Sequence, residues 1–219
     1  KIHALDDLFL NLAWNCHVSV KPLKTCFISY HKSFEHLCTR FAAIETGAEV
    51  HGYPNNLHLN EEQFTQLKND STNEDYLQIN TEPLLRIDDL ISYMRSEFDD
   101  WTGIFFVDDL SAFIYDDWQI VLEKFHAFSA ETQRPIILKK RTHCEEGEQD
   151  ERRDLTYLNH PLYRLTCNHI INVTLPQNHE VINEKIVEFE ILIESFKDFG
   201  DHQFHSMIQD YSTGIIREK

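Results

Sequence analysis

Several kinds of residue and pattern are scarce in this sequence. Only 6 of its 219 residues are glycine and 6 are proline, which argues against a low-complexity chain, and there is no internal repeat. No apolar run approaches the length of a membrane-spanning helix, and the first residues do not have the pattern of a signal peptide. We therefore expect a soluble globular protein.

Cysteine is also sparse, and it follows no CxxC pattern. The five cysteines are an odd number, and they are Cys16, Cys26, Cys38, Cys144 and Cys167. This usage is typical of proteins in a reducing compartment, so we expect an intracellular protein.

Basic residues are outnumbered by acidic ones. Lys and Arg total 20 against 37 Asp and Glu, which gives a net charge of −17, and the acidic residues are spread along the chain. Because binding to DNA depends on neutralising phosphates with basic side chains, direct nucleic-acid binding is not expected. An acidic surface instead favours association with partners that have basic surfaces.

The strongest structural signal is the run from Gly103 to Asp109. The chain is 42% hydrophobic, enough for a full core, and 1–219 is expected to form one domain. An apolar run opened by glycine and closed by carboxylates predicts a strand buried on both faces. Asp108 and Asp109 then stand where α/β sheets bind ligands and where an aspartate can hold magnesium. The alternative is a strand that ends in a solvated turn.

Helical and strand patterns alternate along most of the chain. Helices are predicted over 4–20, 34–46, 61–67, 87–98 and 118–129, and strands over 24–30, 76–79, 103–107 and 135–138. Ser33 and the pair Asn60 and Gln63 are expected to cap helices, and Gly47 is expected to end one. The order predicts an α/β fold with a mostly parallel sheet, in which 103–107 is central and flanked by 25–29 and 135–138.

The last third of the chain has a different pattern. The segments 169–175, 186–193 and 203–208 predict strands in antiparallel arrangement. Between the two parts lies 145–154, whose run of charges without an apolar anchor predicts a mobile loop.

Four segments occur in the order and spacing of a known family. They are LNLAWN at 10–15, FISY at 27–30, GIFFVDDL at 103–110 and QRPIIL at 133–138. Their series resembles the motor domain of the DnaB-type replicative helicases, which are RecA-like ATPases, over nearly the whole chain. The resemblance implies a RecA-like, mostly parallel sheet flanked by helices, with antiparallel strands toward the C-terminus.

The resemblance also identifies the positions at which such a motor binds and hydrolyses ATP. The glycine, lysine and hydroxyl residue of the phosphate loop correspond to Ala4, Leu5 and Asp6. Leucine provides no charge, and an aspartate at the start of the helix repels phosphate. The glutamate that acts as general base corresponds to His31, which is followed by Lys32.

Two further catalytic positions also depart from the family pattern. The sensor amide falls near Lys140 or Arg141, and the basic pair near the C-terminus corresponds to 194–198, where Lys197 is the one basic residue. Asp108 alone remains as a recognisable magnesium- or nucleotide-binding position. These departures predict a degenerate ATPase that needs no cofactor.

The resemblance further implies a strand and a phosphate loop that would precede Lys1. A sheet without its central strand would expose apolar edges, which natural proteins avoid. We therefore expect that strand to lie upstream of the 219 residues.

Two groups of side chains invite a functional interpretation that we do not favour. His202 and His205 resemble a metal-binding pair, but residues three apart on a strand point to opposite faces, so no metal site is expected. Lys139 and the two basic residues after it form the one basic cluster, and we expect them to be a solvated strand end.

The sequence therefore predicts a helicase-like protein that has lost its ATPase and acts as a protein-binding or structural subunit. Its partner is expected to be another copy or a different subunit, contacted through the faces that abut neighbours in helicase rings, with Trp14 and Phe196 as candidates. One alternative is an active ATP-dependent helicase that uses ATP and magnesium. Another is a regulator that docks on a helicase ring.

Overall fold

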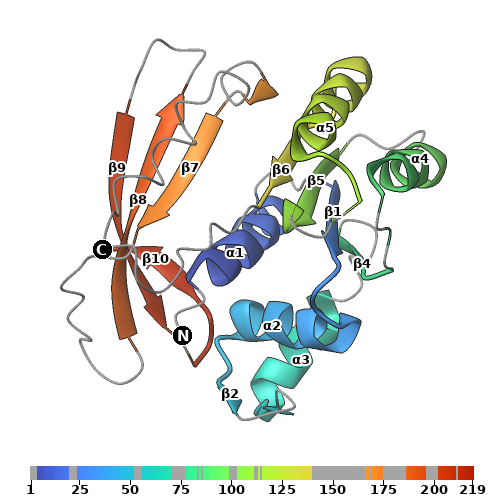
Figure 1. Cartoon of the computed structure of the whole chain (residues 1–219). Coiled ribbons are helices and arrows are strands. Elements are labelled where there is room, and N and C mark those ends of the chain that lie inside the picture. Colours follow the sequence, from blue (N-terminus) through green and yellow to red (C-terminus); the bar gives the residue numbers. More distant parts are fainter. Residues whose placement is uncertain are drawn as a thin grey trace.

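The computed structural model describes most of the chain, and Figure 1 shows its arrangement. The described residues are 4–19, 24–51, 56–70, 77–82, 84, 86–98, 103–110, 113, 115–139, 166–167, 169–174, 186–195, 202–210 and 212–219. The loop predicted at 145–154 lies outside them, as do Lys140, Arg141 and Phe196.

A four-stranded parallel sheet forms the centre of the molecule. Its strands are β4 (Leu77–Asn80), β1 (Lys24–Ser29), β5 (Gly103–Asp108) and β6 (Ile136–Leu138), in that order. Each neighbouring pair runs parallel. The predicted central strand and both of its predicted neighbours are confirmed.

The strands β5 and β6 are hydrogen-bonded directly to each other. Phe105 pairs with Ile136 and Val107 with Leu138, and the pairing continues beyond the strands, where the Leu110 amide donates to the Lys139 carbonyl at 2.9 Å. Among the described residues no strand lies between them. The strand expected before Lys1 remains a prediction.

Helices cover both faces of this sheet (Figure 1). The helices α1 (Ala4–Val18) and α2 (Phe34–Thr46) lie on one face, and α4 (Ile87–Glu97) and α5 (Trp118–Thr132) on the other. The helix α3 (Glu61–Asp70) packs beside α2. A sheet covered in this way needs strands that are apolar on both faces, which explains the continuous apolar runs.

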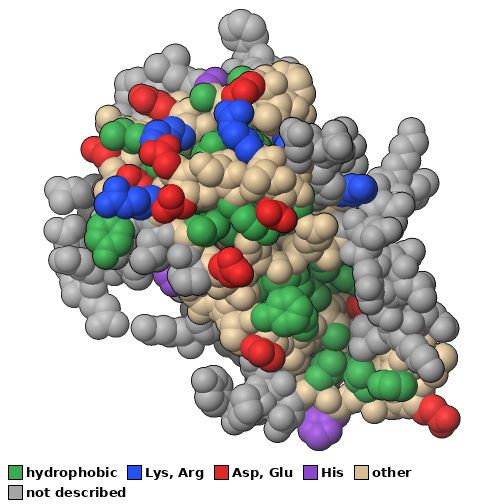
Figure 2. All heavy atoms as spheres, turned by 90° about the vertical axis from the view of Figure 1, so that its right-hand side faces the viewer, with side chains coloured by type: hydrophobic (Ala, Val, Ile, Leu, Met, Phe, Trp, Pro, Cys, Tyr) green, Lys and Arg blue, Asp and Glu red, His purple; other side chains and the backbone are tan. Residues whose placement is uncertain are grey.

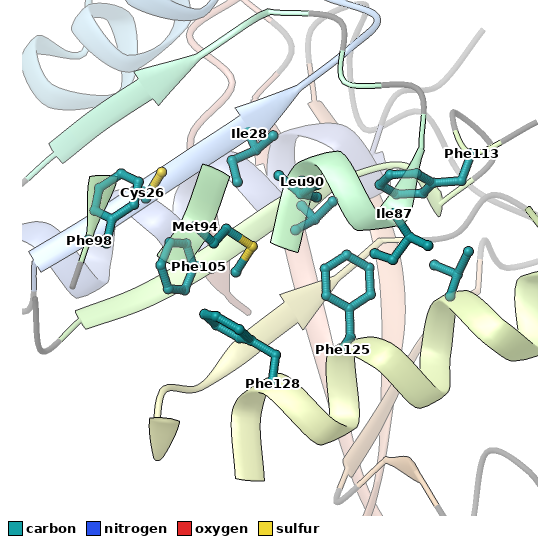
Figure 3. Packing of buried hydrophobic residues seen from close by; sticks show 12 residues of the cluster. Cys26, Ile28, Ile87, Leu90, Met94, Phe98, Phe105, Phe113, Phe125 and Phe128 are labelled. Carbon is teal, nitrogen blue, oxygen red and sulfur yellow. The ribbon is translucent and has the colours of Figure 1, made fainter. Parts of the chain in front are cut away.

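Alternate residues of β5 separate the core into two clusters. Phe105 and Val107 pack toward α4 and α5, whereas Ile104 and Phe106 pack toward α1 and α2. Figure 3 shows the first cluster, in which Met94, Phe105 and Phe128 meet from a helix, a strand and a second helix. The second cluster contains Phe9, Leu10, Ala13, Phe27, Leu37, Phe41, Ile44, Ile104 and Phe106.

The helix ends follow the capping signals of the sequence. The Ser33 hydroxyl accepts from the His36 amide at 3.2 Å, and Gly47 ends α2 in the left-handed conformation, with φ +66°. Asn60 and Gln63 form the predicted reciprocal capping box, at 2.8 and 3.0 Å. The helix α5 runs three residues beyond its prediction because Gln133, with φ 56°, provides the left-handed end.

A second, antiparallel sheet follows in the C-terminal part. Its strands are β10 (Ile216–Glu218), β9 (His202–Asp210), β8 (Ile186–Ser195) and β7 (His169–Thr174), in that spatial order. The sequence patterns missed β10 and the short pair β2 (Val50–His51) and β3 (Asn56–Leu57), because two or three residues carry no periodicity.

His205 lies on β9 and interacts with a carboxylate, as its ring nitrogen Nδ1 is 3.1 Å from Glu218. No group of three metal-ligating side chains occurs in the described part of the chain. No helix there has the length and apolar content needed to cross a membrane.

The helix α1 lies between the two sheets (Figure 1). Phe9, Leu10 and Ala13 face the parallel sheet. Leu8 and Leu12 contact the antiparallel one, where they meet Ile191, Met207 and Ile216. This two-sided burial explains why α1 is apolar around much of its circumference.

Polar side chains also join α1 to the antiparallel sheet. The Asp7 carboxylate accepts from Arg40 of α2 at 2.7 Å and from Gln209 of β9 at 2.5 Å. The Asn11 amide donates to the Gly214 carbonyl at 2.8 Å, and Asn11 also accepts from the Ile216 amide at 3.3 Å. Burial raises the pKa of Asp7, an effect that Arg40 and Gln209 partly offset.

The turn at Gly214 generates a testable prediction. Gly214 has φ +75°, and an added Cβ would lie 2.0 Å from a guanidinium nitrogen of Arg40. Because Arg40 is held by Asp7, we expect Gly214→Ala to lower the free energy of unfolding by roughly 3 kcal/mol, from backbone strain plus loss of the ion pair. Urea unfolding measures this.

Gly47→Ala is the matched control. Gly47 also has a positive φ, but an added Cβ would have open space, with Ile215 at 4.0 Å as its nearest neighbour. We expect a loss of about 1 kcal/mol from backbone strain alone. If both variants lost the same free energy of unfolding, the clash with Arg40 would not contribute to the effect of Gly214→Ala.

Candidate functional site

Four charged side chains meet at the carboxyl edge of the parallel sheet. We call them the charge cluster: Asp6 from the first turn of α1, Lys32 from the turn after β1, Asp108 at the end of β5, and Lys139 directly after β6. Four separate elements converge there because parallel strands place all their carboxyl ends at one edge.

Lys139 is the most deeply enclosed cation of the cluster. Its ammonium group lies 2.7 Å from an Asp6 carboxylate oxygen, forms an ion pair with Oδ1 of Asp108, and stands 5.7 Å from the centre of the Phe9 ring. The residue is only 3% exposed. A buried ammonium group is tolerated only when charges and hydrogen bonds compensate it, and these two carboxylates provide that compensation.

Lys32 joins the same two carboxylates from the other side. Its ammonium group lies 3.2 Å from Asp108 and 3.6 Å from Asp6. The buried Ser29 hydroxyl donates to Oδ2 of Asp108 at 2.8 Å. The cluster therefore contains two positive and two negative charges, and its formal net charge is zero.

Asp6 owes its place to the start of α1. Negative side chains are favourable in the first turn of a helix, where free amide groups and the helix dipole give a positive potential. The same potential binds phosphate in nucleotide-binding folds. In this chain the Asp6 carboxylate occupies the first turn of α1, where Lys32 and Lys139 contact it.

The structure corrects one of the sequence interpretations. Lys139 is not a solvated strand end, because the carboxylates of α1 and β5 hold it in the interior. Asp108 lies at the carboxyl end of β5, the edge of the sheet at which α/β folds bind ligands, and its expected role in magnesium or nucleotide binding stays a prediction. His31 is exposed and contributes nothing to the cluster, whereas Lys32 beside it does.

Asp109 directly follows β5, and its backbone conformation forms the turn after the strand. It is buried and adopts φ 80°, which is costly for a residue other than glycine. The sharp turn that follows lets the Leu110 amide bond to the carbonyl of Lys139. The backbone after β5 is therefore tied to the residue that completes the charge cluster.

The residues present do not fit a magnesium-bound nucleotide. Magnesium prefers carboxylate and phosphate oxygens, but two ammonium groups and a hydroxyl already contact the Asp108 carboxylate. Leu5, which the sequence resemblance aligns with the phosphate-binding lysine, carries no charge. A metal ion at Asp108 would have to displace Lys139, and the displaced cation would lose its compensation.

No protein-family model and no curated protein matches the sequence. Among solved structures, a DnaB-like replicative helicase, described together with its interactions with primase, is similar with a TM-score of 0.73 at 14% identity over 97% of this chain. A KaiC-like protein from the hyperthermophilic archaeon Pyrococcus horikoshii OT3 is similar with a TM-score of 0.60 at 10% identity, over 99% of this chain and 84% of that one.

The chain has the RecA-like fold. The sequence resemblance to a DnaB-type motor domain is thus confirmed at the level of the fold. The chain spans 55% of the length of the DnaB-like helicase. The TM-scores establish a shared RecA-like architecture, and identities of 14% and 10% establish nothing beyond it. The charge cluster lies at the edge of the sheet where α/β folds bind ligands.

Removing one charge from the cluster tests its contribution to stability. We expect Lys139→Met to lower the free energy of unfolding by about 3 kcal/mol, because it leaves Asp6 and Asp108 buried without their closest cation. Chemical denaturation of the purified variant measures the change.

The exposed pair of Lys124 and Asp88 provides the control. Lys124 of α5 also forms a lysine–aspartate ion pair, but both side chains face solvent. Lys124→Met should therefore change the free energy of unfolding by less than about 1 kcal/mol. A Lys139→Met variant as stable as Lys124→Met would mean that the charge cluster does not stabilise the fold.

Proposed function

We propose that this protein is a RecA-fold relative of DnaB-type helicases that no longer uses ATP and acts as a protein-binding or structural subunit. One observation carries the proposal, which is that Asp6, Lys32, Asp108 and Lys139 neutralise one another at the ligand-binding edge of the sheet. The motor domain that the sequence resembles would need that edge for a magnesium-bound nucleotide.

The charges of the cluster argue against nucleotide binding on energetic grounds. A nucleotide would bring several negative charges to the start of α1, where Asp6 is already negative. Binding would require the separation of ion pairs whose members are almost fully buried, such as Lys139 and Asp108. Leaving one such charge uncompensated costs about 3–5 kcal/mol, which nucleotide contacts would have to offset first.

Support for a protein-binding role comes from the fold and the charge. The DnaB-like helicase of similar fold is described with its interactions with primase, so a protein that contains this architecture binds another protein. The net charge of −17 favours partners with basic surfaces. An intracellular location, which the cysteine usage predicts, would suit such a subunit.

Trp14, a candidate for the partner-binding face, is partly buried and packs against the core. Its ring lies 6.2 Å from that of Phe41 and 5.1 Å from that of His17. Packing within the chain therefore accounts for the Trp14 ring, and no partner is needed to explain it. We therefore base the proposed interaction on charge and fold, and we assign no binding role to Trp14.

The first test of the proposal is nucleotide binding. We expect titration calorimetry with magnesium and ATP to detect no binding at millimolar ATP, a limit that corresponds to a binding free energy of about −4 kcal/mol. ATPase activity should also be absent. Hydrolysis by the wild type that disappears in Asp108→Ala would overturn the proposal and support the ATP-dependent helicase alternative.

A pair of variants separates the two losses at the phosphate loop. Asp6→Thr removes the carboxylate that opposes phosphate, and Leu5→Lys combined with Asp6→Thr also restores the lysine. We expect the double variant to bind ATP more tightly than Asp6→Thr, because only the double variant places an additional lysine at the start of α1 for the phosphates. Binding by the wild type equal to that of the double variant would contradict our interpretation of these positions.

A second test concerns nucleic acid. We expect no binding of a fluorescently labelled single-stranded oligo-dT at 150 mM salt, because the acidic chain offers too few cations to neutralise phosphates. Fluorescence anisotropy measures the affinity. Submicromolar binding with a steep dependence on salt would identify the protein as a nucleic-acid-binding subunit and would contradict the proposed role.

A further inference from the structure

A surface hollow lies at the carboxyl end of the edge strand β4. It has a volume of about 600 Å³ and is lined by Phe34, Ile79, Asn80, Thr81, Glu82, Tyr93 and Glu97. We call it the β4 hollow, and it shares no residue with the charge cluster.

We propose that the β4 hollow receives an arginine or lysine side chain from a basic segment of a protein partner. The inference rests on the proposed function, since it names the chemistry of the partner that such a subunit would bind. Three features of the lining carry it: the sign of its charges, its aromatic rings and its pre-formed floor.

The charges of the lining are of one sign. Glu82 and Glu97 contribute two carboxylates, and none of the described residues that line the hollow is basic. Burial raises the pKa of the Tyr93 hydroxyl, a hydrogen bond from Asn80 partly offsets this, and the charges of Glu97 and Glu82 contribute smaller increases. A cation entering there would gain from both carboxylates.

Two aromatic rings complement these charges. Phe34 stands at the start of α2 and is 50% exposed although it is a large apolar side chain. Tyr93 contributes a second ring from α4. The face of an aromatic ring attracts a guanidinium or ammonium group, so carboxylates beside rings form a site suited to a basic side chain.

The floor of the hollow is held in place before any partner binds. Asn80 is the last residue of β4 and is buried. Its side chain accepts from the Glu82 amide at 2.7 Å and forms a side-chain hydrogen bond with Tyr93. These bonds fix the backbone that carries Glu82 and the ring of Tyr93, which lowers the entropic cost of binding.

Figure 2 shows the face of the molecule that is on the right in Figure 1, where α4 and α2 lie. The blue basic side chains of the described residues gather in the upper half of this view. The lower half presents red acidic and green hydrophobic side chains, and no described basic side chain is visible there.

A protein segment fits the hollow better than a free small cation does. Phe34, Glu82 and Glu97 are exposed, so the site would cover only part of a small molecule. A side chain carried by a protein gains further binding energy from the contacts that surround it. The acidic lining also repels nucleic acid and anionic membranes.

The experiment uses an acetylated and amidated hexa-arginine peptide as the probe, titrated into the full chain by calorimetry. We expect the double variant Glu82→Gln/Glu97→Gln to bind it about fivefold more weakly than the wild type, and Phe34→Ala about threefold more weakly. Because all three side chains are exposed, the variants should unfold at the same temperature as the wild type.

Two residues of α3 provide matched controls outside the hollow. Glu62→Gln removes an exposed carboxylate, and Phe64→Ala removes a ring that is 61% exposed. Each should change peptide affinity by less than twofold. Losses in the controls equal to those in the hollow variants would show attraction by net charge alone and would overturn the inference, as would the absence of peptide binding to the wild type.

The outcome is independent of the nucleotide test. ATP binding by the wild type would overturn the proposed function, but it would not contradict a peptide affinity that depends on the residues of the hollow. If the hollow variants bind the peptide as tightly as the wild type does, and the chain binds no ATP, only the present inference is overturned.

Discussion

Charge compensation around Lys139 is the constraint on which the centre of this structure depends. The ammonium group is buried at the edge of the sheet, and it is stable there only because Asp6 and Asp108 flank it. These partners come from the first turn of α1 and from the central strand. The position of α1 over the sheet is therefore determined by electrostatics as well as by the packing of Phe9 and Leu10.

The same constraint changes the chemical character of the ligand-binding edge. A RecA-like sheet offers strand ends and a helix start at one place, which favours anions and metal ions. Here the chain itself supplies both the anions and the cations at this edge, and their ion pairs stabilise the folded structure. The protein then has the RecA-like architecture, and under the proposed function its surface, including the β4 hollow, would provide the chemistry available to partners.

Most of the fold was predictable from the sequence because its signals are local. The apolar run of β5, the Ser33 cap and the Asn60–Gln63 capping box each act over a few residues, and each was found where predicted. The role of Lys139 was not predictable, because its partner Asp6 is 133 residues away and only the folded sheet brings them together. A lysine after a strand has the same local pattern whether it faces solvent or carboxylates.

The contacts of α1 with the second sheet have a consequence for the order of folding. Asn11 bonds to residues 203 and 205 positions further along the chain. During synthesis α1 leaves the ribosome before β10 does, and it cannot obtain these partners until β10 has also emerged. Leu8 and Leu12 therefore remain without their final apolar neighbours while the intervening residues are translated, so α1 exposes apolar surface that a chaperone could protect.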